Sequence, residues 1–253
     1  QTRERTPPEL DSKMETGSWD YWAEIGQGFV DAVSLLVTGD PDTWGIVRQS
    51  LLISLSATIV SMVFGVPLGF WIAYSRFPGR SLFLAICNTG FGLPPVVVGL
   101  ILSILLLRHG PLGYLNLRFT PYAMMIGQFI LSMPIIINLT VVALQQLDPR
   151  LRMQIKALGA SRWQTVLLLS REIRLPLLVA YMAGFGAVVS EVGASQMLGG
   201  NLPGSTRVLT TAIVMETGMG HYDRAMAYGI VLLLLVALVV GLLTWMQQRD
   251  GQR

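Results

Sequence analysis

The sequence has few charged residues and almost no cysteine, and each shortage excludes a class of protein. Only 13% of its 253 residues are charged, whereas an ordinary soluble domain has about 25%. Cys87 is the single cysteine, so no disulfide can form within the chain, and we expect its side chain to be a small buried hydrophobic group. No Gly-Lys-Ser or Gly-Lys-Thr occurs, so the nucleotide-binding loop of an ATPase is absent and we expect no cofactor in this chain.

Long runs without Asp, Glu, Lys or Arg are abundant. A helix needs about 20 apolar residues to cross the hydrocarbon of a bilayer. Uncharged runs occupy 51–73, 82–107, 121–147, 175–190 and 225–248, and the fourth can continue through Glu191. They predict an all-α, polytopic membrane helix bundle of about five transmembrane helices. We expect a polar tail at 1–18 and one membrane domain at 19–253, with spans at about 46–75, 81–107, 121–147, 173–198 and 225–247.

Prolines and glycines interrupt these runs. Membrane helices tolerate proline kinks where neighbouring groups satisfy the freed carbonyls, and glycines let helices approach closely. We therefore expect kinks in the first three spans and close helix contacts, in a bundle that can line a pathway and change shape. The prolines are Pro67, Pro94, Pro95 and Pro134, and the glycines are Gly65, Gly69, Gly90, Gly92, Gly99, Gly184 and Gly186.

The distribution of charge predicts the orientation of the bundle. Residues 1–45 hold three cations and nine carboxylates. Beyond them, one set of alternate loops holds ten Lys or Arg residues and the opposite set five. Because cytoplasmic loops are richer in cations, the N-terminus is predicted outside and the C-terminus in the cytoplasm. The segment 19–38 has an apolar face but also Asp20, Glu24 and Asp31, so we expect a helix lying on the outer surface rather than a sixth span.

The link between the third and fourth spans, 148–172, is unusually polar for this chain. Asp148 can cap a helix and Pro149 fits its first turn. Gly159 should end that helix, and Ser161 should cap a second one that merges into the fourth span. Such an elbow protrudes, and Trp163 on it is typical of an anchor residue in a protein interface.

The segment ALGASRW, 157–163, resembles the cytoplasmic loop motif of permease subunits of ATP-binding-cassette importers, whose coupling helix docks on an ATPase subunit. Gly159 matches the family pattern. Met-Gln-Ile at 153–155 replaces the usual Glu-Ala-Ala, and Leu-Pro at 175–176 comes about one helical turn late. The segments GLPPVVVGL and SEVGASQMLGGNLPGSTRVLTTAI are similar to parts of the molybdate, sulfate and tungstate permeases, and tungstate permeases are similar over most of 24–247.

The resemblance implies the fold and the partners of a type I importer permease. It implies a homodimer enclosing a path in a bacterial or archaeal plasma (inner) membrane, with two ATPase subunits in the cytoplasm that bind ATP and Mg. An extracytoplasmic oxyanion-binding protein would deliver the substrate, and the permease itself would not be an enzyme. The residues implied to couple to the ATPase are Ala157, Leu158, Gly159, Ala160, Ser161, Arg162, Trp163 and Gln164.

In this interpretation, 165–176 is a shaft rigidly continuous with the fourth span. The substrate is expected to be tungstate, with molybdate or sulfate as the alternative. An ATP-independent secondary anion transporter is a further alternative, although we find no internal repeat and no proton-relay charges. An intramembrane enzyme would need a nucleophile with a base or a metal cluster, and the spans contain neither pattern.

Polar residues inside the spans are candidates for the gate and the pathway. A translocated anion must bind weakly enough to leave, which favours hydroxyl and amide donors over bare cations. Glu191 is expected to bind backbone amides or a cation such as Arg207 and so to hold a gate. His109 and His221 are expected to be solvated or to contact the binding protein. The remaining candidates are Ser132, Asn138, Thr140, Ser190 and Ser195.

Overall fold

The computed structural model describes residues 26, 28–34, 38–75 and 77–251, and these residues form helices and no strand. Three helices are long and apolar enough to cross a membrane alone, and two bent pairs reach that length together, so the predicted all-α bundle of about five spans is confirmed. The helices are α3 (Pro41–Tyr74), α4 (Arg80–Thr89), α5 (Pro95–Leu105), α6 (Pro121–Gln145), α7 (Pro149–Ala157), α8 (Arg162–Glu172), α9 (Arg174–Val189), α10 (Gly193–Gly199), α11 (Leu209–Gly218) and α12 (Tyr222–Gly251), with 3-10 turns at Gly90–Gly92 and Gly113–Leu115.

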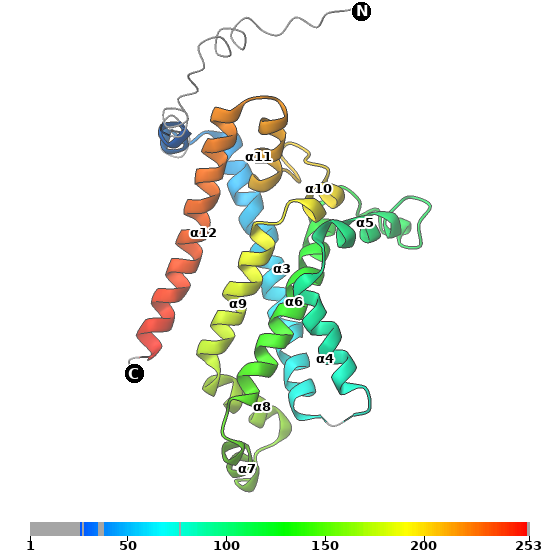
Figure 1. The fold of residues 1–253 in the computed structure, drawn as a ribbon, viewed down its shortest axis with the longest axis vertical. Helices are drawn as coiled ribbons and strands as arrows, with labels where there is room; N and C mark the ends of the chain where they lie inside the picture. Colours follow the sequence, from blue (N-terminus) through cyan, green and yellow to red (C-terminus); the bar gives the residue numbers. More distant parts are fainter. Residues whose placement is uncertain (1–25, 27, 35–37, 76, 252–253) are drawn as a thin grey trace, which may run out of the picture.

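Helix α6 is the centre of the bundle and packs against α3, α4 and α9 (Figure 1). The contact with α3 is the most extensive because small residues let the two backbones approach. A Cβ atom added at Gly65 would lie 2.9 Å from Ile136 Cγ2. The hydroxyls of Ser61 and Ser132 lie 2.6 Å apart across the same contact. Apolar packing and a buried hydrogen bond therefore join α3 to α6.

The expected glycine contacts are mostly present. Added Cβ atoms would crowd a neighbouring segment at Gly65, Gly69, Gly90, Gly99 and Gly184. At Gly92 and Gly186 no heavy atom lies within 4 Å of such an atom, so the expectation of close contact is wrong at these two positions. Cys87 is buried beside Ile72 and Ile137, as expected.

The prolines have two different effects. Pro67 and Pro134 lie inside α3 and α6, which continue through them. Pro94 and Pro95 separate α4 from α5, which meet at 103°. Two successive prolines remove two adjacent amide donors and drive both Leu93 and Pro94 to extended backbone, at ψ 118° and 117°, so the helix breaks here rather than continuing as it does through a single proline. Helix α5 consequently projects sideways from the bundle (Figure 1).

The fourth apolar run is also broken. The sequence predicts a span over 173–198, whereas α9 ends at Val189 and α10 begins at Gly193. Three residues, 190–192, separate the two helices. Thr210 on α11 donates a hydrogen bond of 3.0 Å to the carbonyl oxygen of Glu191, which the break leaves without a helical partner. The break is therefore held by the segment that follows it.

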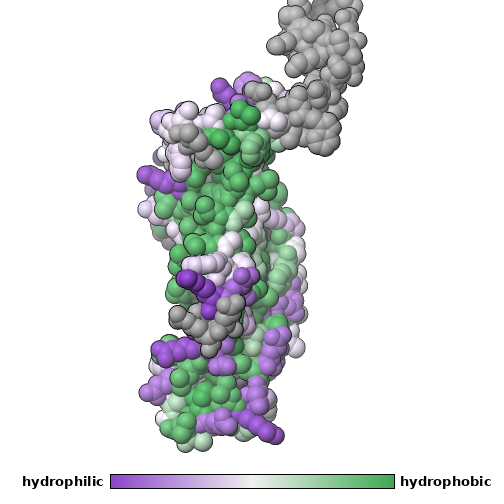
Figure 2. Space-filling view, turned by 90° about the vertical axis from the view of Figure 1, so that its left-hand side faces the viewer, coloured by the Kyte–Doolittle hydropathy of each residue, from purple (hydrophilic) through white to green (hydrophobic). Residues whose placement is uncertain are grey.

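The expected surface helix at 19–38 lies partly outside the described residues, as does the polar tail 1–18. Residues 28–34 are helical, and Ala32 is buried in an apolar cluster with Ala227 and Val231 of α12. One side of α12 faces outward, and Leu233 and Leu238 on it are about 70% exposed. Figure 2 shows a broad hydrophobic band on the side of the molecule where α12 lies, with hydrophilic residues gathered below it. This face suits contact with lipid.

We predict that Gly69→Ala destabilises the protein by roughly 1–3 kcal/mol because an added Cβ overpacks the α3–α6 contact. The new atom would lie 2.8 Å from Thr140 Cβ and 3.2 Å from the Ile137 carbonyl oxygen. Gly241→Ala on α12 is the matched control, since nothing lies within 4 Å of its added Cβ. Thermal unfolding of the purified protein in detergent measures both. A Gly69→Ala variant as stable as the control would show that this packing account is wrong.

Candidate functional site

The elbow predicted at Gly159 is present. Gly159, two residues beyond the end of α7, has φ +79°, a left-handed conformation that favours glycine. The Gly159 amide donates to the Lys156 carbonyl over 3.0 Å, and the Ala160 amide donates to the Ile155 carbonyl over 3.3 Å. This pair of bonds is a Schellman motif, which satisfies the last carbonyls of the helix. No other atom lies within 4 Å of an added Cβ at Gly159, so backbone conformation alone requires glycine there.

The predicted caps of both elbow helices are confirmed. The Asp148 carboxylate accepts a 2.8 Å hydrogen bond from the Arg150 amide at the start of α7. At the start of α8 the Ser161 hydroxyl accepts from the Gln164 amide over 3.3 Å, and the Gln164 side-chain oxygen accepts from the Ser161 amide over 2.7 Å. This reciprocal capping box fixes the direction in which α8 leaves the turn.

The elbow lies at one end of the molecule (Figure 1), and it presents large apolar side chains to solvent. Leu158 is 88% exposed and Trp163 is 80% exposed. Ala157 is exposed and Ala160 is half-buried. Arg162 is the first residue of α8, and its side chain is not among the parts of the chain that the structure describes. An exposed leucine and tryptophan on a rigidly capped turn form a surface suited to contact with a protein.

The expected rigid shaft at 165–176 is wrong. Helices α8 and α9 meet at 79°, and Ile173 lies at the bend. Pro176 gives the physical reason, because it has no amide hydrogen to bond the carbonyl of residue 172 in a continuous helix. It occupies the third position of α9, where a missing donor costs little.

The bend is packed rather than loose. Ile173 is 1% exposed and belongs to an apolar cluster with Phe70 of α3 and Leu144 of α6. Ile155 of α7 and Leu169 of α8 are in the same cluster. Both elbow helices are therefore fixed to the spanning helices through one set of buried side chains. A force on the elbow would act on the bundle through this cluster.

The pathway candidates separate into buried and surface residues. Ser132 and Thr140 are fully buried in α6, and each donates to the carbonyl one turn earlier, over 2.9 Å and 2.7 Å. Their hydroxyls thus face the interior of the bundle. Ser190 is exposed, although its hydroxyl also bonds the carbonyl of residue 186.

Asn138 of α6 lies closer to the surface and is paired with a residue that the sequence analysis missed. Its side-chain amide donates to the side-chain oxygen of Asn88 on α4, and Asn88 is exposed. An exposed amide pair within the apolar part of a membrane bundle is costly against lipid and suits a water-filled path. The signal for Asn88 was available, because it is a strongly polar residue inside the uncharged run 82–107.

Glu191 binds backbone amides, the first of the two arrangements expected for it. Its two carboxylate oxygens accept hydrogen bonds from the amides of Ala194 and Ser195 over 2.9 Å and 3.0 Å. These amides belong to the first turn of α10, where a negative charge is favourable. Glu191 is 7% exposed, so the bonds are shielded from water. Among the described residues no ion pair joins Glu191 to Arg207, whose Nε is buried without a hydrogen-bond partner.

The segment GNLPGSTR, 200–207, folds around Thr206. The Thr206 hydroxyl donates to the Gly199 carbonyl over 2.5 Å and accepts from the Leu202 amide over 2.9 Å. The Gln49 side chain on α3 donates to the Ser205 carbonyl and attaches the segment to the bundle. Its polar groups are therefore largely used to hold its own shape.

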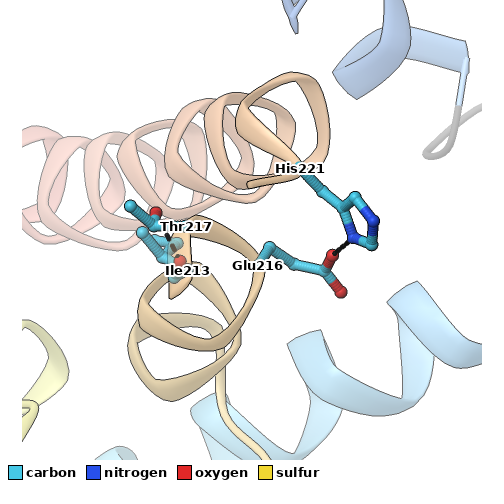
Figure 3. A network of polar contacts seen from close by, with 4 residues as sticks. All are labelled: Ile213, Glu216, Thr217 and His221. Atoms are coloured by element: carbon cyan, nitrogen blue, oxygen red, sulfur yellow. Dashed lines mark hydrogen bonds and ion pairs between the residues drawn. The ribbon is translucent and has the colours of Figure 1, made fainter. Parts of the chain in front are cut away.

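A second buried carboxylate lies near the end of α11 and was not predicted. Glu216 on α11 is 6% exposed, and its carboxylate lies 2.9 Å from His221 Nδ1 (Figure 3). His221, expected to be solvated, is half-exposed and bound to Glu216, whereas His109 is exposed. Nearby at the start of α3, hydrogen bonds from the Thr43 hydroxyl and amide lower the pKa of Asp40 below its usual value. Polar side chains thus order this end of the bundle.

Comparison with known proteins agrees with this geometry. The model of the family described as "Binding-protein-dependent transport system inner membrane component" matches residues 65–250. The tungstate uptake system permease protein TupB of Peptoclostridium acidaminophilum is 37% identical over 211 residues, covering 83% of this chain and 92% of that protein. A probable anion ABC transporter permease protein of Haloferax volcanii is 37% identical over 196 residues, covering 76% of this chain and 84% of its own length.

A solved structure shares the fold. The inward-facing MetNI methionine ABC transporter contains a chain that superposes with a TM-score of 0.63 at 20% identity, covering 84% of this chain and 97% of that one. The family model spans most of the sequence, including the elbow, the bend at Ile173 and the Glu191 break. The chain therefore belongs to the family of inner membrane components of binding-protein-dependent transport systems.

Proposed function

We propose that this chain is the membrane-spanning permease subunit of an ATP-binding-cassette importer that carries tungstate into the cytoplasm. Two copies would enclose the path, two ATPase subunits would bind ATP and Mg beneath them, and an extracytoplasmic protein would deliver the oxyanion. The chain would supply no catalytic group. The elbow end would face the cytoplasm and the α11 end the exterior, in agreement with the excess of cations in the loops at the elbow end.

The observation that supports this proposal most strongly is the exposed elbow in a chain of this family. Leu158 and Trp163 project from a turn fixed by Gly159 and by the Ser161 cap. Two large apolar side chains in water are unfavourable unless a partner covers them. Docking of an ATPase on this surface would let closure of the ATPase move α7 and α8 against the Ile173 cluster. The movement would pass into α9 through a packed bend, as one rigid group turning against another.

The relatives support an oxyanion as the substrate. One relative is a tungstate permease and another an anion permease, each 37% identical to this chain. Asn88, Asn138 and Ser190 place amide and hydroxyl groups at or near the surface of the spans. Uncharged donors can bind a dianion without trapping it, as a transport path requires.

Molybdate or sulfate is the alternative substrate within the same class. Both are tetrahedral dianions like tungstate, and molybdenum and sulfate permeases are also similar to this chain, at 27% identity. An ATP-independent anion transporter is a weaker alternative because it gives no reason for the exposed elbow.

The substrate is tested by reconstituting the permease with its ATPase and binding protein in liposomes. We predict that tungstate with the binding protein stimulates ATP hydrolysis and that sulfate at the same concentration does not. The readout is the rate of phosphate release with each oxyanion. Stimulation of ATP hydrolysis by sulfate alone would overturn the tungstate assignment. Oxyanion transport that does not depend on ATP would overturn the importer class.

Docking at the elbow is tested by replacing Leu158 and Trp163 together with alanine. Losing two anchor side chains should cost at least about 2 kcal/mol, or roughly thirtyfold in affinity for the ATPase. Co-purification of the ATPase with the tagged permease measures the loss. Tyr114→Ala is the control because Tyr114 is 75% exposed, yet lies in the loop beyond α5 and away from the elbow. Undiminished ATPase recovery with the double variant would contradict docking at this surface.

Glu191→Gln tests the break between α9 and α10. A carboxylate accepts both amide hydrogen bonds, whereas the glutamine NH₂ group would oppose one amide donor. We expect transport to fall while the affinity of the binding protein for the oxyanion is unchanged. Uptake in proteoliposomes and titration of the binding protein measure the two quantities, with the exposed Asp223→Asn as control. Normal transport by Glu191→Gln would remove Glu191 from the mechanism.

A further inference from the structure

A cavity of about 700 Å³ lies where α3 meets the elbow. Its volume falls within the range of small-molecule sites, roughly 300–1,000 Å³. One wall is apolar and is formed by Pro67, Phe70 and Trp71 of α3. Tyr74 of α3 and Arg152 of α7 add polar groups to the lining, and Trp163 and Val166 of α8 add further apolar ones. The lining is therefore both apolar and basic.

Arg152 is incompletely satisfied in this cavity. Its guanidinium carbon lies 3.8 Å from the centroid of the Tyr74 ring, a cation–π contact that fixes its position. Its Nε is shielded from water and has no hydrogen-bond partner among the described residues. A buried donor without an acceptor is unfavourable, and one on a charged group more so. Because Arg152 lines the cavity, an anion there would lie beside its positive charge.

The charge of the lining also favours an anion. Lys156 follows Arg152 by one helical turn, so both cations lie on the same face of α7 and line the cavity. Among the described residues that line the cavity, none is Asp or Glu. The site therefore presents two cations that no carboxylate at the cavity neutralises.

The apolar wall distinguishes between a soluble anion and a lipid. Pro67 lies seven residues before Tyr74, which is about 10 Å along the helix. The wall thus extends from the end of the spanning helix into the depth of the hydrocarbon. Trp71 in this wall is half-exposed and stacks on Phe77 with 4.6 Å between the ring centroids, and tryptophan is enriched at membrane boundaries. A free oxyanion gains nothing from such a wall, whereas an acyl chain does.

We propose that this cavity binds one anionic phospholipid of the cytoplasmic leaflet. The headgroup phosphate contacts Arg152 and Lys156, and an acyl chain lies along Pro67, Phe70 and Trp71. Basic pockets beside transmembrane helices on the cytoplasmic side bind anionic headgroups in this way. The inference rests on the orientation given under the proposed function. A lipid at this place joins α3 to α7 and so stiffens the elbow against the bundle.

The test is native mass spectrometry of the full chain in detergent, with dioleoylphosphatidylglycerol or dioleoylphosphatidylcholine added. We expect the anionic lipid to bind more tightly. Removing one cation with Lys156→Gln should weaken its binding about fivefold, and adding Arg152→Gln about fivefold more. Lys156 is exposed, so the single variant should fold even if the double variant does not. Arg150→Gln is the matched control, because Arg150 is an exposed cation on the same helix that does not line the cavity.

Three results would overturn the proposal. An equal loss of binding in Arg150→Gln would show general attraction to a basic surface. Binding of inorganic phosphate or tungstate at the site without binding of phosphatidylglycerol would show a site for a free oxyanion. Loss of the lipid when the ATPase co-purifies would show that the ATPase fills the cavity. The lipid experiment measures binding and not transport. A failure of the lipid proposal would therefore leave the importer assignment untouched, and the reconstitution experiment tests that assignment separately.

Discussion

The bundle depends on how the chain satisfies the backbone groups that are freed wherever a helix breaks in or near the membrane. Water cannot bond these groups in the hydrocarbon, so each break needs a partner from the protein. The Glu191 carboxylate binds the first amides of α10, and Thr210 binds the carbonyl of Glu191. The Thr206 hydroxyl binds the Gly199 carbonyl and the Leu202 amide, and the Ser161 hydroxyl binds the Gln164 amide at the start of α8. The breaks are therefore fixed structures, and a bundle with fixed breaks can move as rigid parts.

The elbow and the bend at Ile173 form one such part. Gly159 turns the chain between α7 and α8, while Ile155 and Leu169 attach both helices to the apolar cluster around Ile173. A straight shaft would transmit force along the axis of α9. In the proposed coupling, the 79° bend would instead make α8 a lever whose fixed point is the cluster. The proposed lipid beside Arg152 would brace the same lever against α3.

The sequence predicts those features that single residues dictate. Asp148 and Ser161 are residue types that cap helices, and Gly159 has no Cβ to oppose a left-handed turn, so the elbow is predictable. The bend at Ile173 has a local signal in Pro176, but its 79° angle depends on packing against Phe70 and Leu144, which lie far away in the sequence. The sequence also does not show which way a hydroxyl side chain in an apolar run points. Ser132 faces α3, and no local signal distinguishes it from a residue that faces a transport path. The unpaired Nε of Arg152 and its contact with Tyr74 likewise follow only from the packing of α7 against α3, which the sequence does not show.

Hydrogen–deuterium exchange of the backbone amides at 157–164 tests the central claim that the elbow couples this permease to an ATPase. The measurement compares the permease alone with the complete complex in the same detergent. The account predicts slower exchange at 157–164 in the complex, and unchanged exchange in the loop at 106–120 near the other end of the bundle. Equal exchange at the elbow in both samples, with the ATPase shown to be bound, would contradict the account.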